Sequence, residues 1–138
     1  MIAVDTNVVA YLLIQGERTA AARQLWEIDP DWRLPPLWRA EFLNVLATSH
    51  RAGILSADQA RSAWHTAVDL LRGCEVEPTG ATVLDLALSL GITAYDAQFV
   101  SVARSLGTRL VTSDRRLCRA FPDLVLHLKR APAELSRR

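Results

Sequence analysis

Two short apolar runs that each end in an aspartate constrain the fold of this chain more than any other feature. The first is residues 2–5 (IAVD), and the second is residues 110–114 (LVTSD), where Thr112 and Ser113 precede the acid. A helical pattern follows each run. Continuous apolar runs are typical of parallel strands that are covered on both faces. We therefore expect both runs to be strands of a mainly parallel sheet.

The residues between these runs have the periodicity and the end signals of helices. Thr79 and Thr93 are expected to cap two of them. Short strands are also expected at residues 124–128 and near residues 32–34 and 74–76. The expected helices span residues 8–13, 19–28, 37–51, 56–71, 79–90, 93–106 and 115–120. Few strands alternating with many helices predict a three-layer α/β/α domain around a short central sheet.

Length and composition limit the possible classes of protein. A chain of 138 residues is one domain in size, and we expect a single domain over residues 1–138, with residues 130–138 as a loose tail. The net charge of +1 does not support general polycationic binding to nucleic acid. The longest apolar run, residues 8–14, is too short to cross a bilayer, and no secretory signal is visible. We expect a cytoplasmic protein without a membrane partner.

Asp5 and Asp114 each follow an expected strand directly. Ligands of open parallel sheets bind outside the carboxyl ends of the strands, so both acids are candidate site residues. In the alternative, each acid only caps the helix that follows it. If the two strands are neighbours, the two like charges lie close together, which is unfavourable without a cation or a shared proton.

Two further acids lie on expected helices. Glu41 belongs to a largely apolar stripe, where a carboxylate is costly unless it is paired or bound to metal. Its structural alternative is an ion pair with Arg39 or Arg51. Asp96 stands three residues after Thr93, where it either completes a capping box or faces the strand ends from the start of its helix.

Together these four acids form a candidate site for a hard metal ion. Carboxylates without histidine or cysteine companions favour Mg²⁺ or Mn²⁺ over zinc. Such an ion lowers the pKa of an attacking water and neutralises charge that builds on a phosphodiester. Neighbouring polar residues are candidates to orient waters or carboxylates. These supporting residues are Thr6, Asn7, Thr112 and Ser113. The pattern predicts a metal-dependent phosphodiesterase.

At this point the sequence resembles the PIN-domain family. Residues 1–7 (MIAVDTN) resemble its opening motif, and Glu41 in residues 39–42 (RAEF) resembles its helix acid. Residues 94–97 (AYDA) and 110–114 (LVTSD) resemble its third and fourth motifs. The motifs occur in order and at the usual spacing across essentially the whole chain. The small size without an added domain resembles VapC-type toxins of bacterial type II toxin–antitoxin pairs.

The resemblance implies a PIN-like α/β fold and a Mg²⁺-dependent endoribonuclease, with Mn²⁺ as a possible substitute. Thr112 would be the hydroxyl helper of the last motif and Asn7 a nearby polar helper. Family members usually form homodimers and are held inactive by a cognate antitoxin protein whose tail enters the active-site groove. RNA, rather than DNA, is expected as the substrate on this ground alone. The implied catalytic and metal-binding residues are Asp5, Glu41, Asp96 and Asp114.

Four arginines lie close to these acids in the sequence and are candidates for binding RNA phosphates. Their alternative is a solvated helix face. They are Arg39, Arg115, Arg116 and Arg119. Two other functions remain open from the residues: a non-catalytic RNA- or protein-binding module, and a small Mg²⁺-dependent phosphohydrolase. The phosphohydrolase commonly carries a second aspartate two residues after the first, and Asn7 occupies that position here.

Overall fold

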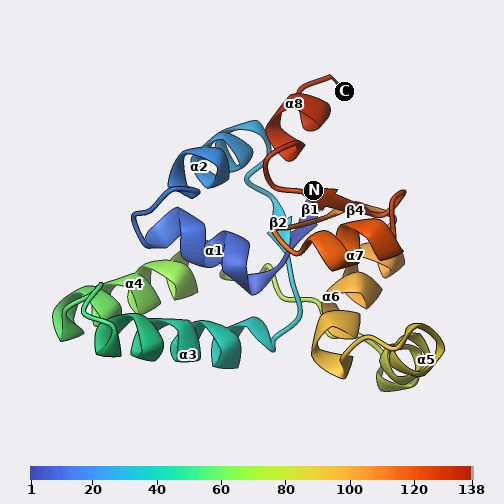
Figure 1. Cartoon of the computed structure of the whole chain (residues 1–138), viewed down its shortest axis with the longest axis horizontal. Helices are drawn as coiled ribbons and strands as arrows, with labels where there is room; N and C mark the ends of the chain where they lie inside the picture. The colour runs from blue at the N-terminus through green and yellow to red at the C-terminus, as the bar shows by residue number, and fades with distance from the viewer. Residues whose placement is uncertain (138) are drawn as a thin grey trace.

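The centre of the molecule is a four-stranded sheet in which all strands are parallel, with the order β2-β1-β3-β4. The computed structural model describes residues 1–137 and is drawn in Figure 1. The strands are β1 (Ile2–Val4), β2 (Trp32–Arg33), β3 (Leu110–Thr112) and β4 (Val125–His127). The two apolar runs are thus β1 and β3, and they pair directly. An isolated parallel bridge from Leu34 to Glu75 extends the β2 edge.

Within residues 1–137 seven helices connect these strands, and an eighth, α8, follows β4. They are α1 (Thr6–Leu13), α2 (Thr19–Ile28), α3 (Trp38–Arg51), α4 (Ala57–Leu70), α5 (Gly80–Leu90), α6 (Ala94–Ser105), α7 (Arg115–Ala120) and α8 (Ala131–Leu135). Among these helices none has by itself the length and apolarity to span a bilayer. Only α5 and α6 taken together have that length and apolarity, and the two helices are bent by 116° relative to each other.

Helices cover both faces of the sheet. The connection from β1 to β2 runs through α1 and α2 toward one edge, whereas the connection from β3 to β4 runs through α7 toward the other. Because parallel crossovers are right-handed, these two connections place their helices on opposite faces. Figure 1 shows α1 and α2 on one side of the sheet and α6 on the other. The predicted three-layer α/β/α fold is confirmed.

The topology creates a crevice between β1 and β3. These strands are neighbours, but the chain leaves them in opposite directions. Such a reversal opens space at the carboxyl ends of the two strands, where ligands bind in sheets of this kind. Asp5 follows β1 at this point, and Ser113 and Asp114 follow β3. The fold therefore brings the first and last predicted motifs to one edge of the sheet.

Aromatic packing fixes α3 and α4 beside this edge. Trp38, at the start of α3, is fully buried, and its ring centroid lies 5.8 Å from that of Trp64 on α4. Trp32 of β2 is also fully buried and makes an edge contact with Trp26 of α2 at 5.0 Å. Buried aromatic pairs of this kind dominate the packing energy of a small core. They give α3, which carries Glu41, a fixed position relative to the sheet.

Two local expectations differ from the structure. Thr79 occupies the cap position of α5, but its side chain makes no capping hydrogen bond. In the stretch expected to be a loose tail, α8 buries Ala131 and Leu135, and Arg130 forms an ion pair with Glu134 at 2.8 Å. Apolar contacts therefore hold this stretch against the core. The sequence does not indicate this plainly, because charged residues flank the apolar ones. Residue 138 lies outside the described residues.

Candidate active site

A cavity of about 230 Å³ lies where β1, α3 and α6 meet. Three of the four predicted acids line it: Asp5 after β1, Glu41 from the first turn of α3, and Asp96 from the first turn of α6. Thr6 and Asn7, at the start of α1, complete its polar wall. The tertiary structure thus gathers side chains from distant parts of the sequence into one concave site.

Asp5 caps α1 and also lines the cavity, so its helix-capping contact does not keep it away from the candidate site. Its carboxylate caps α1 by accepting a hydrogen bond from the backbone N–H of Val8 at 3.1 Å, and it accepts another from the Thr112 hydroxyl. Burial raises the pKa of Asp5 to about 6, against the lowering effect of these hydrogen bonds. The negative charges of Glu41 and Asp96 raise it further. A cation in the cavity would stabilise the ionised carboxylate of Asp5.

Thr112 joins the ends of β1 and β3. Its side chain is fully buried, its hydroxyl donates to Asp5, and the same oxygen accepts the backbone N–H of Asp114 at 3.0 Å. Asp114 in turn caps α7 by accepting the backbone N–H groups of Arg116 and Leu117 at 2.9 and 3.4 Å. One hydroxyl therefore sets the relative position of two predicted site acids.

Asp114 differs from the other acids in its electrostatic environment. Burial by itself would raise the pKa of its carboxyl, but the hydrogen bonds and the charge of Arg116 outweigh burial and lower it. Asp114 does not line the 230 Å³ cavity with the other three acids. Its charge nevertheless reaches Asp96, because it contributes to the raised pKa of that residue. Asp114 thus stands at the side of the cavity as a carboxylate that stays ionised.

Glu41 is held by a hydroxyl, not by the arginines considered as its structural partners. Thr6 donates to one of its carboxylate oxygens at 2.7 Å. Arg39 forms an ion pair with Glu75, and Arg51 donates to the Thr48 hydroxyl at 3.3 Å. Within residues 1–137 Glu41 therefore has no ion-pair partner. A charged group without a counterion beside other carboxylates is suited to binding a cation.

Asp96 owes its position to the start of α6. The Thr93 hydroxyl accepts the backbone N–H of Asp96 at 3.0 Å, which caps the helix as predicted and fixes its first turn. Burial raises the pKa of Asp96, and the charge of Asp114 adds to this effect, while Thr93 and Arg116 oppose it. The carboxylates of the site are therefore coupled electrostatically.

The chemistry of these side chains fits a hydrated magnesium ion. Within residues 1–137 no three His, Cys, Asp or Glu side chains lie close enough together to hold one ion between them. Mg²⁺, however, commonly binds proteins through only one or two carboxylates and keeps several waters. The polar wall offers carboxylate, hydroxyl and amide groups without thiols or imidazoles. That donor set suits Mg²⁺ or Mn²⁺ rather than zinc.

A family model described as PIN domain matches residues 2–121. The chain belongs to the PIN-domain family. Ribonuclease VapC3 from Pyrobaculum aerophilum is 30% identical over 125 residues, which are 88% of this chain and 95% of that relative. A crystal structure of PAE2754 from Pyrobaculum aerophilum has a TM-score of 0.76 and 24% identity, over 99% of this chain and 90% of that one. The resemblance to PIN domains and to their VapC-type members is confirmed.

The polar and basic residues predicted around the acids have distinct positions in this PIN domain. Ser113 makes a hydrogen bond of 2.8 Å with the Tyr11 hydroxyl, on the α1 side of the sheet. Arg39 stacks on Trp38 and pairs with Glu75, and Arg116 lies 3.5 Å from the Asp114 carboxylate. The remaining two basic residues, on α7, are exposed. They are Arg115 and Arg119.

Other residues of the PIN domain's cavity were not predicted from the sequence. Asn44 and Phe99 lie one helical turn after Glu41 and Asp96, so helical spacing alone could have placed them on the same faces. Leu117 of α7 and Val45 also line the cavity. No sequence signal distinguishes these apolar residues from the core, because only the crossing of α3, α6 and α7 brings them to the site.

Proposed function

We propose that this PIN domain is a Mg²⁺-dependent endoribonuclease that acts as the toxin of a VapBC-like type II toxin–antitoxin pair. One observation carries the proposal. Asp5, Glu41 and Asp96 line a single cavity at the topological switch point, and Asp114 stands beside them. The name of the relative, Ribonuclease VapC3, supports RNA as the substrate.

The proposed metal ligands are Asp5, Glu41, Asp96 and Asp114, directly or through waters. Mg²⁺, or Mn²⁺ in its place, supplies a water of lowered pKa and positive charge against the scissile phosphodiester. The chain itself supplies orientation. Thr112 holds Asp5, Thr6 holds Glu41, and the cap at Thr93 fixes the turn that carries Asp96. Hydroxyl groups that hold carboxylates in this way keep the ligands in place before the ion binds.

Binding of the RNA backbone falls to cations outside the cavity. Arg115 and Arg119 are exposed on α7, next to the Asp114 cap. Arg116 and Arg39 already have carboxylate partners, so we expect them to contribute less. Each arginine that contacts a phosphate strengthens RNA binding in a salt-dependent way.

The proposal includes three further properties: a cognate antitoxin that binds at the groove, a homodimer, and a cytoplasmic location. An exposed apolar face on α5 supports the dimer. Leu84 and Leu88, one turn apart on this helix, are 55% and 73% exposed. Leu90 at the end of α5 and Tyr95 at the start of α6 are exposed as well. Apolar patches of this kind commonly mark protein interfaces.

The first experiment compares the wild-type protein with Asp96→Asn on total cellular RNA. Both proteins are incubated with Mg²⁺ or Mn²⁺ and then with EDTA. We expect discrete products from the wild type that disappear in EDTA and are absent for Asp96→Asn. The matched control is Asp69→Asn, which removes an acid that is exposed, paired with Arg72 at 2.9 Å, and not part of the cavity wall. The control should cleave like the wild type.

Other outcomes of this experiment point to the alternatives. Equal cleavage by the wild type and Asp96→Asn would mean that a contaminant or another site is responsible. RNA binding without cleavage by any of the proteins favours a binding module. Rapid hydrolysis of p-nitrophenyl phosphate without RNA cleavage would identify a small phosphohydrolase and contradict the proposal.

A further inference from the structure

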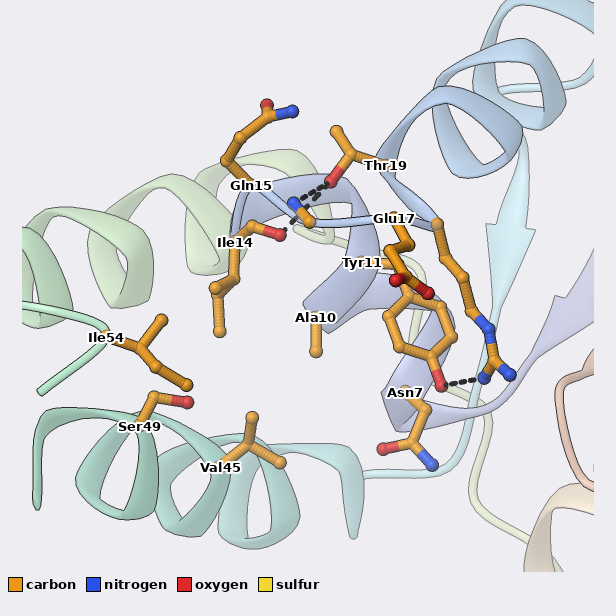
Figure 2. A pocket seen from close by; sticks show the side chains of 12 residues that line it. Asn7, Ala10, Tyr11, Ile14, Gln15, Glu17, Thr19, Val45, Ser49 and Ile54 are labelled. Atoms are coloured by element: carbon orange, nitrogen blue, oxygen red, sulfur yellow. Dashed lines mark hydrogen bonds between the residues drawn. The ribbon is translucent and has the colours of Figure 1, made fainter. Parts of the chain in front are cut away.

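A second cavity, of about 410 Å³, adjoins the candidate active site. It lies between α1, the segment that joins α1 to α2, and α3. Asn7 and Val45 line both cavities, so the two adjoin. Figure 2 shows Val45, Ser49 and Ile54 facing Ala10 and Ile14 across this space. A chain ligand with one unit in the carboxylate cavity would therefore have its next unit beside the second cavity.

The wall of this second cavity carries a fixed cation. The Arg18 guanidinium donates to the Tyr11 hydroxyl at 2.8 Å, drawn as a dashed line to Tyr11 in Figure 2, and lies 5.3 Å from the centre of the Tyr11 ring. The Tyr11 hydroxyl also bonds to Ser113 after β3 at 2.8 Å. Tyr11 thus ties Arg18 to the strand end that carries Asp114.

The backbone around Arg18 is also fixed. The Thr19 hydroxyl accepts the N–H of Gly16 at 3.0 Å and donates to the carbonyl of Ile14 at 3.1 Å. These two bonds close the turn between α1 and α2, and Thr19 is buried. The position of the cation is therefore set before any ligand binds, which reduces the entropy lost on binding.

Arg18 has no carboxylate within ion-pair distance among residues 1–137, unlike Arg39 and Arg116. A second cation, Arg115, begins α7 directly after the Asp114 cap. Burial lowers the pKa of His127 at the end of β4, and the positive charges of Arg115 and Arg18 lower it further, so both guanidinium groups are near this imidazole. Two uncompensated arginines beside a carboxylate site are complementary to a polyanion whose phosphate is cleaved there.

The shape of the cavity suits one nucleoside. Its walls are mostly apolar, from Ala10, Ile14, Val45 and Ile54, with the amides of Asn7 and Gln15 and the hydroxyl of Ser49 among them. The carboxylate of Glu17 also lines the cavity, but this side chain is exposed and can turn to solvent. Sites for small ligands of about 300–1,000 Å³ usually combine apolar walls with a few polar groups in this way. A base or sugar fits against the apolar wall, and the adjoining phosphate faces Arg18.

We propose that this cavity is a nucleotide subsite for single-stranded RNA, in which Arg18, held by Tyr11, binds the backbone phosphate next to the scissile one. The inference rests on the proposed function, because it assigns the subsite to the same RNA substrate. It commits to RNA rather than to a protein segment, because the cavity adjoins the candidate phosphodiester site. In addition, the charged side chain that a hydrogen bond holds on the wall is the cation Arg18, whereas the Glu17 carboxylate beside it is exposed.

The test measures RNA binding separately from cleavage. All variants are made in the Asp96→Asn background, and a fluorescein-labelled RNA octamer of mixed sequence is titrated in EDTA by fluorescence anisotropy. We expect Arg18→Gln to weaken binding about tenfold and to reduce the slope of log affinity against log salt by about 0.7, as for one lost phosphate contact to a single strand. Arg18→Lys should recover part of the affinity, because it retains the charge.

Two controls separate contact from structure. Arg72→Gln removes an equal charge from an exposed arginine that is paired with Asp69 at the end of α4, and it should leave the affinity and the salt slope unchanged. Tyr11→Phe keeps the ring but removes the hydroxyl that holds Arg18, and it should weaken binding less than Arg18→Gln. In the Asp96→Asn protein, which retains Arg18, the bound octamer should protect Arg18 from modification by phenylglyoxal. Peptide mass spectrometry measures the extent of this modification.

The outcomes distinguish this inference from the proposed function. If cleavage depends on metal and on Asp96, but Arg18→Gln binds the octamer like Arg72→Gln and Arg18 is not protected, the subsite is wrong and the nuclease stands. If Arg18→Gln leaves RNA binding intact and instead weakens binding of a co-purified protein, the cavity is a protein-binding site. If no RNA is cleaved or bound by any protein, both proposals fail together.

Discussion

At Asp5 the stability of the metal-free protein conflicts with the proposed role of this residue as a metal ligand. Its carboxylate is buried, faces other acids, and has a pKa of about 6 instead of the ordinary 3.8. Between these two pH values the folded chain keeps a proton that the unfolded chain has lost. The contribution of Asp5 to stability therefore falls as the pH rises through this window. At neutral pH the metal-free protein carries an ionised group that destabilises it.

The first prediction follows from this conflict. In metal-free buffer at pH 7.5, Asp5→Asn should be more stable than the wild type by up to about 3 kcal/mol, which is the equivalent of the raised pKa. Asparagine also caps helices well, so α1 retains its cap. The difference should shrink toward pH 5, where Asp5 is protonated. Thermal unfolding of both proteins from pH 5 to pH 8 measures this difference in stability. His127, whose pKa is lowered, changes stability with pH in the opposite direction, but it is present in both proteins and its effect cancels in the comparison.

The same variant should lose RNA cleavage despite its greater stability. Added Mg²⁺ should raise the melting temperature of the wild type and have less effect on Asp5→Asn, because binding to the folded state alone stabilises it. A lower melting temperature for Asp5→Asn than for the wild type at pH 7.5 would contradict the account of Asp5 given above.

Thr112 provides the second prediction. Thr112→Val keeps the shape of the side chain but removes the hydroxyl that donates to Asp5 and accepts the N–H of Asp114. We expect a loss of about 1–3 kcal/mol in the free energy of unfolding, since buried polar groups lose a partner. Cleavage should fall as well, and Thr112→Ser should restore most of both. Urea unfolding and RNA cleavage measure the two effects; Thr66→Val, at an exposed position of α4, is the control.

At the scale of the elements, α6 determines where Asp96 lies. The cap made by the Thr93 hydroxyl holds the first turn of α6, whereas Thr79 occupies the same position of α5 without a side-chain bond. The two threonines form a natural matched pair, because only one of them uses its hydroxyl to cap a helix. They separate the effect of a cap from the effect of changing a threonine at a helix start.

The third prediction uses this pair. Thr93→Ala should lower the free energy of unfolding by about 1 kcal/mol, the usual effect of losing a cap. It should also lower the cleavage rate, since the turn that carries Asp96 loses its anchor. Thr79→Ala should change both quantities little. Urea unfolding and cleavage of a fixed RNA substrate measure them, and equal losses for the two variants would show that the cap does not position Asp96.

At the scale of the whole molecule, the exposed face of α5 is the feature that an isolated chain leaves unexplained. Leu84 and Leu88 lie one turn apart and are more than half exposed. Within residues 1–137 no other helix covers them. Neither leucine lines the cavity of the candidate site, so the proposed homodimer would bury this face and leave that cavity free for RNA.

The fourth prediction concerns this assembly. The wild type should be a dimer by light scattering after size exclusion, and Leu84→Ser with Leu88→Ser should shift it to a monomer with unchanged circular dichroism. Leu43→Ser, at another exposed leucine, on α3, is the control and should remain a dimer. A monomeric wild type, or a dimer that survives the double change, would show that α5 is not the interface.

Many strands and helices of this protein were predictable from the sequence, because they depend on local patterns of residues. The apolar runs before Asp5 and Asp114 predicted parallel strands, and caps and stops placed the helices close to their observed ends. The family was predictable as well, since four acids in the motifs of PIN domains indicated it, whereas the metal site that they suggest stays a prediction. These features depend on residue type and near neighbours, which the sequence displays directly.

Other features depended on the tertiary structure. Only the strand order makes β1 and β3 neighbours, so only the fold gives Thr112 its bonds to Asp5 and Asp114. Arg18 and Tyr11 belong to no motif, and they became candidates only because the fold joins Arg18 to Tyr11 and Tyr11 to Ser113. Contacts between distant residues leave no local signal, because the chain that joins them can take any path. Which acids share a cavity, and which arginines already have partners, are therefore properties of the folded molecule.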